Sequence, residues 1–156
     1  MNRKTVLIMV PVLIVAILIV ALVMDGGEKP ADVRYDYDVE VVDSFMTGSG
    51  YEQESSPGED YAIVTWVVVN DHYEDGFDTN MLTFSTSVVV NGLSYTTTVD
   101  TYSHPDYKLV TVLEGGSATF AYVYDVPEGT DPSDVEVQYE YIWTFDPPTM
   151  ERDPTL

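Results

Sequence analysis

The stretch of sequence that decides the fold is residues 82–99, LTFSTSVVVNGLSYTTTV. Apolar or threonine side chains occupy every second position on both sides of Asn91 and Gly92, which is the period of a strand with one face on a core. Asn-Gly between two such runs is a strong hairpin signal, because both turn positions need a positive φ that these residues tolerate. We therefore predict an antiparallel hairpin with its turn at Asn91-Gly92.

Strand patterns continue on both sides of this hairpin. Residues 61–69 are apolar at both parities, as expected for a central strand covered on two faces. Further strands are predicted at residues 33–41, 108–113, 120–126 and 135–145. About seven strands separated by turn signals predict an all-β, immunoglobulin-like antiparallel β-sandwich, with a barrel as the alternative.

The first part of the chain has a different character. Residues 5–24 contain no charge, and as a helix they would reach about 30 Å, the thickness of the hydrocarbon core of a bilayer. We predict a transmembrane α-helix that holds the chain in the lipid bilayer. A cleaved signal peptide is the alternative, although the run exceeds the usual apolar length and lacks a small-x-small cleavage site.

The charges around this segment predict its orientation. Arg3 and Lys4 precede it, whereas Asp25 and Glu28 follow it. By the positive-inside rule, the N-terminus is cytoplasmic and everything after residue 24 lies outside the cell, as in a single-pass cell-membrane protein.

The domain organisation follows from these patterns. We predict a basic start and anchor at residues 1–24, a linker at 25–32, an extracytoplasmic sandwich at 33–146 and a flexible tail at 147–156. The tail contains three prolines and no apolar period. Inside the sandwich, the polar stretch at residues 48–60 is predicted to be a loop.

The charge balance excludes one large class of partners. Residues 25–156 carry all 27 acidic residues against four basic ones, a net charge of −23. Because nucleic-acid binding depends on Lys and Arg that release counterions from phosphates, a role on DNA or RNA is excluded. The sequence also has no cysteine, which excludes disulfides, thiolate zinc sites and cysteine nucleophiles in this chain.

The sequence offers no set of residues that predicts an enzyme. A hydrolytic triad needs a nucleophile, a histidine and an orienting acid, and the only histidines are His72 and His104, both among loop residues. We predict neither a catalytic residue nor a bound cofactor.

One acidic segment at residues 71–80 suggests a metal. It offers five hard oxygen donors of the kind that calcium binds, from Asp71, Glu74, Asp75, Asp78 and Asn80. It is not an EF-hand, because Tyr73 and Leu82 stand where ligands are needed. The choice is between a calcium site in a sandwich loop and an acidic loop that is only solvated.

The chain contains 12 tyrosines, and most of them follow the core parity of a strand. We predict core or sheet-face packing for Tyr35, Tyr37, Tyr122, Tyr124, Tyr139 and Tyr141. The loop residues Tyr73, Tyr102 and Tyr107 are the predicted ligand surface, if the domain has one.

Short motifs carry a family resemblance. They are the apolar strand that ends at Asn70, VNGLSY at residues 90–95, LEGGS at 113–117 followed by Phe120, and DVP at 125–127. On these motifs, residues 61–137 resemble a telokin-like, immunoglobulin-like domain family of unknown function, which occurs in bacterial and archaeal lipoproteins and membrane-anchored proteins. The resemblance implies a sandwich and export, and it implies no catalytic residue. Members often begin with a lipid-modified cysteine, where this chain has an apolar span.

Together these features predict a non-enzymatic, membrane-anchored cell-envelope protein. It would present its acidic domain as an interaction or structural module and bind an envelope protein or glycan through its loops or an open sheet edge. One alternative is a calcium-binding surface module that uses residues 71–80. Another is a pilin-like subunit, which Gly26-Gly27 argues against, because two glycines end the apolar helix where a pilin would continue it.

Overall fold

The structure is a computed structural model, which describes residues 30–142 and 144–156. The predicted membrane span at residues 5–24 lies outside the described residues. Within the described ranges, no helix is long and apolar enough to cross a membrane. Residues 31–156 form one compact unit.

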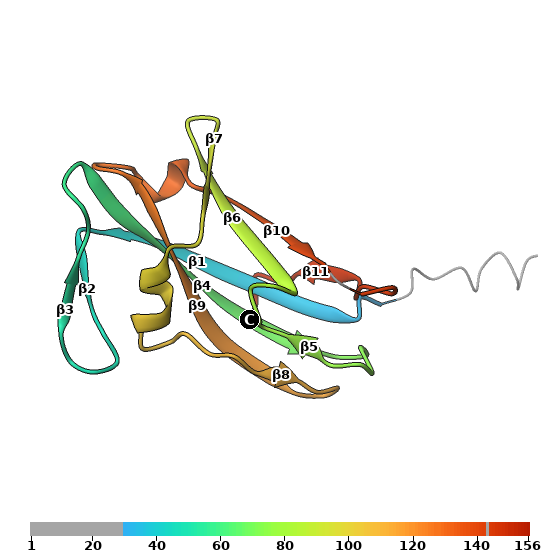
Figure 1. Ribbon diagram of the computed structural model, residues 1–156. Coiled ribbons are helices and arrows are strands. Elements are labelled where there is room, and N and C mark those ends of the chain that lie inside the picture. The colour runs from blue at the N-terminus through green and yellow to red at the C-terminus, as the bar shows by residue number, and fades with distance from the viewer. Residues whose placement is uncertain (1–29, 143) are drawn as a thin grey trace, which may run out of the picture. The chain divides into compact units, whose positions relative to one another are not determined.

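The described chain is all-β, as the alternation predicted, and most of its strands form two sheets (Figure 1). The first sheet has the order β11 (Met150–Arg152), β1 (Val33–Val42), β4 (Glu59–Asn70), β9 (Ser117–Pro127). The second has the order β10 (Glu136–Tyr141), β6 (Phe84–Val90), β7 (Leu93–Thr96). The smaller elements are the pair β2 (Ser44–Met46) and β3 (Glu52–Glu54), the pair β5 (Phe77–Asp78) and β8 (Thr111–Val112), and the 3₁₀ helices η1 (Val99–Ser103) and η2 (Pro132–Asp134).

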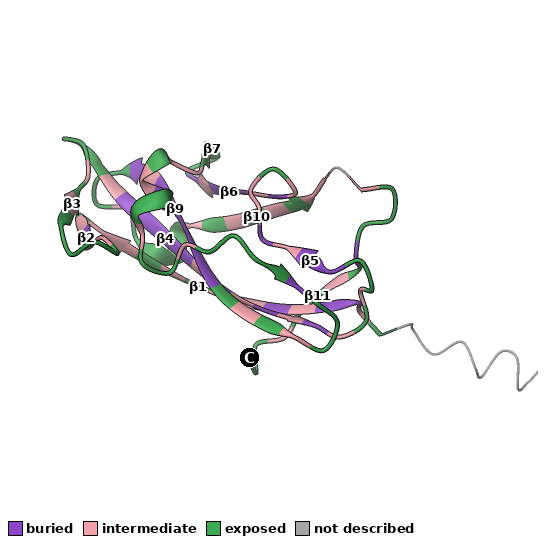
Figure 2. Cartoon of the chain, turned by 60° about the horizontal axis from the view of Figure 1, so that its bottom comes forward, coloured by how far each residue is buried: buried purple, intermediate pink, exposed green. Residues whose placement is uncertain are grey.

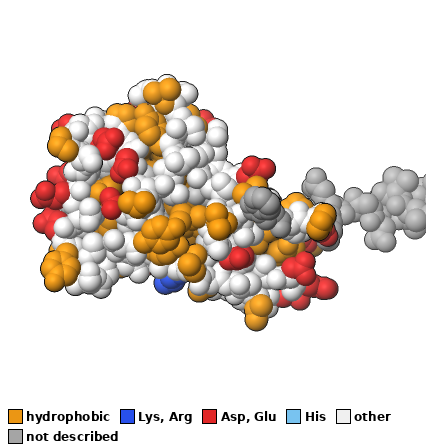
Figure 3. Space-filling view, in the orientation of Figure 1, with side chains coloured by type: hydrophobic (Ala, Val, Ile, Leu, Met, Phe, Trp, Pro, Cys, Tyr) orange, Lys and Arg blue, Asp and Glu red, His pale blue; other side chains and the backbone are white. Residues whose placement is uncertain are grey.

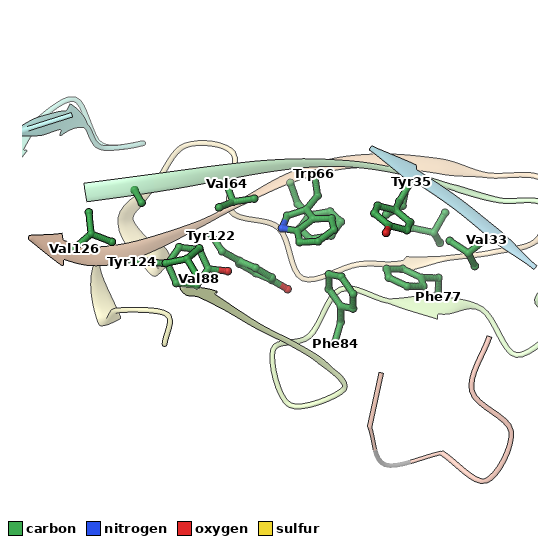
Figure 4. Packing of buried hydrophobic residues seen from close by; sticks show 14 of the residues in the cluster. Val33, Tyr35, Val64, Trp66, Phe77, Phe84, Val88, Tyr122, Tyr124 and Val126 are labelled. Atoms are coloured by element: carbon green, nitrogen blue, oxygen red, sulfur yellow. The ribbon is translucent and has the colours of Figure 1, made fainter. Parts of the chain in front are cut away.

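The two sheets pack face to face, because their inward side chains belong to one buried cluster (Figure 4). Trp66 of β4 is fully buried in it. Its ring centroid lies 5.1 Å from that of Phe84 on β6 and 5.8 Å from that of Tyr139 on β10, nearly perpendicular to both. Such edge-to-face contacts stabilise a core beyond the area that they bury. The predicted core parity is confirmed for all six strand tyrosines: Tyr35, Tyr122 and Tyr124 are buried, and Tyr37, Tyr139 and Tyr141 pack against the cluster.

The first half of β4 is covered on its outer face as well. Tyr61 and Ile63 belong to a second buried cluster, with Phe45 of β2 and with Ala121 and Val123 of β9. Figure 2 shows the buried residues of β4 and β9 in purple. A central strand covered on both sides was the prediction for residues 61–69. The structure confirms it for residues 61–64, whereas Thr65, Val67 and Val69 on the outer face are half-buried.

The hairpin at residues 82–99 is confirmed at its turn. Asn91 has a φ of 52° and Gly92 a φ of 79°, and Val90 pairs with Leu93. The second strand is shorter than predicted, because the chain leaves the sheet after Thr96 and forms η1. The predicted strand at 108–113 is likewise reduced to the two residues of β8.

The polar stretch at residues 48–60 is not a simple loop. It contains β3, which pairs with β2 in an antiparallel hairpin, with Phe45 opposite Gln53. Residues 59 and 60 already belong to β4. The hairpin escapes sequence patterns because its pairing is made by backbone groups, and Phe45 is its one buried side chain.

The C-terminal residues differ most from the prediction of a flexible tail at 147–156. Met150–Arg152 form β11, which pairs in parallel with β1, Met150 lying opposite Val33. Beside this pair, the buried Asp32 carboxylate accepts hydrogen bonds from the backbone N–H and the hydroxyl of Thr149, at 3.0 and 2.8 Å. The prediction of a wholly antiparallel sandwich is therefore wrong at this one pair.

Arginines reinforce this contact between β1 and residues 149–153, which we call the terminal seam. Arg34 Nε donates to Asp71 Oδ2 at 2.6 Å, and Arg34 Nη1 donates to Asp153 Oδ2 at 2.8 Å. Arg152 Nε donates to Asp36 Oδ1 at 2.9 Å. The guanidinium of Arg34 thus joins both ends of the domain to the loop after β4.

We expect Arg34→Met to lower the melting temperature of the full-length chain near pH 6, and the difference from wild type to shrink below about pH 4. The hydrogen bond from Arg34 lowers the pKa of Asp71, and bonds from Thr155 and then Arg34 hold the pKa of Asp153 at about 2. Carboxylates with depressed pKa values stabilise the fold above their unfolded pKa and lose that contribution as the pH falls through the folded value. Thermal unfolding from pH 6 to 2 at constant ionic strength measures the difference.

Lys108→Met is the matched control, because it removes the same charge from an exposed position away from the seam. A difference for Arg34→Met that stays constant from pH 6 to 2 would contradict the ion pairing described here.

Candidate functional site

The acidic segment at residues 71–80 was the predicted calcium site, and the structure gives its donors separate roles. Asp71 is paired with Arg34. The Asp78 carboxylate accepts a hydrogen bond from the Asn80 N–H at 2.9 Å, and the Asn80 side chain accepts one from the Leu82 N–H at 2.9 Å. These last two bonds close local turns after β5.

The remaining two predicted ligands, Glu74 and Asp75, are exposed. Across residues 30–142 and 144–156, no group of three or more His, Cys, Asp or Glu side chains is arranged to hold a metal ion. The structure therefore does not assemble the five donors into a preformed calcium site.

The two histidines have different surroundings. His72 is exposed. His104 is half-buried, its ring centroid lies 5.2 Å from that of Phe45, and its Nδ1 accepts a hydrogen bond from the Asp106 N–H at 3.2 Å. Burial lowers the pKa of His104 and outweighs the opposing effect of the Asp106 and Glu40 carboxylates. A neutral His104 thus helps to cover the outer face of β4.

The clearest candidate for a binding surface lies on η1 and the β2–β3 hairpin. Four large apolar side chains are more than half exposed there: Met46 at 58%, Tyr51 at 74%, Val99 at 76% and Tyr102 at 61%. We call these four residues the distal patch, because the β2–β3 hairpin and η1, which carry them, lie toward the end of the sandwich away from the start of β1 (Figure 1). Figure 3 shows apolar side chains over the surface formed by η1 and the segment after it, with acidic side chains to either side.

Hydrogen bonds fix the two elements that carry the distal patch. The buried Thr101 hydroxyl of η1 donates to the Val123 carbonyl at 3.1 Å and accepts from the Val123 N–H at 2.9 Å. The hairpin is joined to η1 by the Gly48 N–H, which donates to the Ser103 carbonyl at 3.0 Å. The exposed side chains therefore stand on an ordered base.

The charged side chains around the distal patch are carboxylates. The Tyr61 hydroxyl donates to the Asp100 carboxylate at 2.7 Å, and burial followed by this bond raises the pKa of Tyr61 to about 12. Asp106 and Glu40 are exposed carboxylates near His104. The Tyr102 ring stands edge to face with Tyr107 at a centroid distance of 5.1 Å.

An open hollow of about 510 Å³ lies on the same hairpin. Its lining is strongly acidic and includes Asp43, Glu52, Glu54, Glu59, Asp60 and Glu128. The field at this end of the domain is therefore negative, and it favours a partner with positive charge.

Of the tyrosines predicted to form a ligand surface, Tyr102 alone is exposed. Tyr73 and Tyr107 are half-buried and pack against the main core. The sequence did not indicate Met46 and Tyr51, because the β2–β3 hairpin was not predicted and nothing local indicates that it meets η1. Gly50 was a signal for the turn of this hairpin: it has a φ of 83°, and the Thr47 N–H donates to the Tyr51 carbonyl across the turn at 2.7 Å.

For the acidic segment, we expect millimolar calcium and magnesium at matched ionic strength to shift the melting temperature of the full-length chain equally. The reason is that Asp71 is held by Arg34 and that Asp78 and Asn80 are held in turns. A specific site filled to 100 times its Kd would add about 2.7 kcal/mol. A calcium-specific rise of several degrees that Asp75→Asn removes and Glu140→Gln keeps would contradict this expectation.

Comparisons with known proteins find little similarity to this chain. No family model matches the chain, so the telokin-like resemblance has no family model behind it, and no curated protein matches it either. One solved structure is similar, that of a predicted lipoprotein, ycdA, from Bacillus subtilis, with 13% sequence identity and a TM-score of 0.41. The match covers 72% of this chain and 38% of the other, so this chain spans well under half the length of that protein.

Proposed function

We propose that this protein is a non-enzymatic, membrane-anchored component of the cell envelope that presents an acidic, immunoglobulin-like sandwich outside the cell as an interaction module. The observation that carries the proposal is the distal patch. Large apolar side chains cost free energy when they are left in water, and a group of them exposed on adjoining elements is typical of a binding surface. Tyrosine is also the side-chain type that often dominates the energy of protein interfaces.

The elements that carry the patch are held in fixed positions, and this supports a binding role for its side chains. Thr101 and Gly48 fix η1 and the hairpin to the sandwich and to each other. Side chains on a fixed base lose less conformational entropy on binding than those on a mobile loop, so the same contacts give higher affinity. The patch is therefore suited to recognition without rearrangement.

The position of the patch fits an anchored module. Residues 25–32 join the predicted span to the start of β1, and the patch lies at the other end of that ten-residue strand. At about 3.3 Å per residue, β1 separates the patch from this point of attachment by roughly 30 Å. The proposal thus keeps the binding surface away from the place where the chain would leave for the bilayer.

Charge supports an extracellular location. The proposal places a domain of net charge −23 in the exterior medium, where dissolved salt screens its repulsion over about 10 Å or less. The same charge keeps copies of the domain apart and in solution. No reaction is part of the proposal, and His104 serves in packing.

The location has its own test. In cells that make the full-length chain, we expect alkaline carbonate to leave it in the membrane fraction, and protease added to intact cells to remove a C-terminal epitope tag but not an N-terminal one. The reason is the apolar run at residues 5–24 with basic residues before it. Recovery of the chain in the soluble fraction, or protection of the C-terminal tag, would show that the proposed location is wrong.

The interaction role is tested by photo-crosslinking in the same cells. A photoreactive residue at position 102 should give discrete higher-mass species, because Tyr102 belongs to the distal patch. The same residue at position 82 is the control, since Leu82 is also exposed and lies outside the patch, in the segment between β5 and β6. Equal labelling from positions 102 and 82, or none from either, would contradict an interaction surface at the patch.

A further inference from the structure

One guanidinium group, that of Arg152, is already bound on the surface of this domain by an aromatic ring and a carboxylate. The Cζ atom of Arg152 lies 4.2 Å from the ring centroid of Tyr37, while Arg152 Nε donates to Asp36. An aromatic face and a neighbouring carboxylate both bind a guanidinium favourably. Among the described residues, this combination occurs in the terminal seam.

The distal patch and the residues beside it carry the same two kinds of group, and none of the Lys and Arg residues that the structure describes forms an ion pair with them. Tyr102 is exposed, and Asp106 and Glu40 are exposed carboxylates beside the adjoining His104. The described chain has three Lys or Arg residues, and two of them, Arg34 and Arg152, are paired at the terminal seam. Among the described residues, exposed tyrosines and carboxylates therefore outnumber the arginines that could bind them.

The charges around the patch indicate which kind of partner it would bind. The charged groups beside it are carboxylates, which accept hydrogen bonds and favour a partner with charged donors. A domain of net charge −23 repels anionic partners and attracts cationic ones. Between the two cationic side chains, an exposed aromatic surface favours arginine, because the guanidinium is planar, more weakly hydrated than an ammonium and able to stack on a ring while it pairs with a carboxylate.

We propose that the distal patch binds an arginine-bearing segment of a partner protein, with a guanidinium stacked on Tyr102 and hydrogen-bonded to the Asp106 carboxylate. The apolar side chains of Met46, Tyr51 and Val99 would contact the neighbouring residues of that segment. This inference rests on the proposed function, that the patch is an interaction surface, and adds the chemistry of the partner. A neutral glycan, which would also stack on tyrosine, is the competing occupant.

The test is fluorescence anisotropy on the full-length chain in a non-ionic detergent. Three labelled peptides of one design are compared, a Gly-Ser chain with four evenly spaced arginines, lysines or citrullines. Citrulline keeps the planar shape of arginine and lacks its charge. We expect the arginine peptide to bind about three- to fivefold more tightly than the lysine peptide and the citrulline peptide not to bind, since an exposed cation–π contact is worth about that factor.

Variants locate the site. Tyr102→Leu keeps an apolar side chain without the ring, and it should weaken arginine-peptide binding about three- to fivefold, down to the affinity of the lysine peptide. Asp106→Asn should also weaken it. Glu140→Gln and Leu82→Ala are the matched controls at exposed positions elsewhere, and both should bind as wild type does. Tyr51→Leu is a second patch variant, and the circular dichroism spectrum and melting temperature of each variant verify its fold.

Three results would overturn the inference. Equal affinity for the arginine and lysine peptides, unaffected by Tyr102→Leu, would mean attraction to a polyanion without a site. Binding of a neutral oligosaccharide to the patch, with no binding of the arginine peptide, would mean a glycan surface. No binding of any probe, together with crosslinks from position 102 in cells, would mean a partner of other chemistry. In the last two cases the proposed interaction role would stand, whereas equal crosslinking from positions 102 and 82 would remove it independently of the peptide results.

Discussion

The rest of the structure depends on the burial of β4 on both faces. One face places Trp66 among aromatic rings of the opposite sheet and forms the main core. The other face carries Tyr61 and Ile63, which are apolar and would be exposed if the sandwich consisted of its two main sheets alone. Burying two such side chains contributes several kcal/mol, on the order of 1.5–3 kcal/mol each. A cover over the first half of β4 is therefore a requirement of the fold.

That cover is also what places the distal patch. Phe45 reaches over β4 from the β2–β3 hairpin, and Thr101 fastens η1 to β9 beside it. Each element buries one face and must leave another in water, and the residues left there include Tyr51 and Tyr102. The binding surface that we propose is thus the outer side of a structural cover, which explains why it is fixed without a core of its own.

The sequence predicts the parts of this architecture that depend on local pattern. The alternation in β1 and β6, the apolar run of β4 and the Asn91-Gly92 turn all appear where expected, because a strand with a buried face needs that spacing. β11 could not be found in this way: Met150–Arg152 has no apolar period, and its pairing depends on Arg34 and Asp153, which are 119 residues apart. Calcium binding by the acidic segment at 71–80 stays a prediction, because counting oxygens gives no information about where each carboxylate points. The loop position of Tyr102 was enough to predict it as a surface residue, whereas Tyr51 becomes a candidate only once the contact between the hairpin and η1 is known.

The central claim is that η1 is an ordered cover held to the sandwich by Thr101, and amide hydrogen exchange of the full-length chain tests it directly. The comparison is between wild type and Thr101→Val, which keeps the side-chain volume and removes both hydrogen bonds to Val123. We predict that residues 98–106 are protected in wild type and exchange faster in the variant, while β1 and the second half of β4 keep their protection. Exchange at residues 98–106 that is already as fast as in an unfolded chain, or that does not respond to the substitution, would contradict the account.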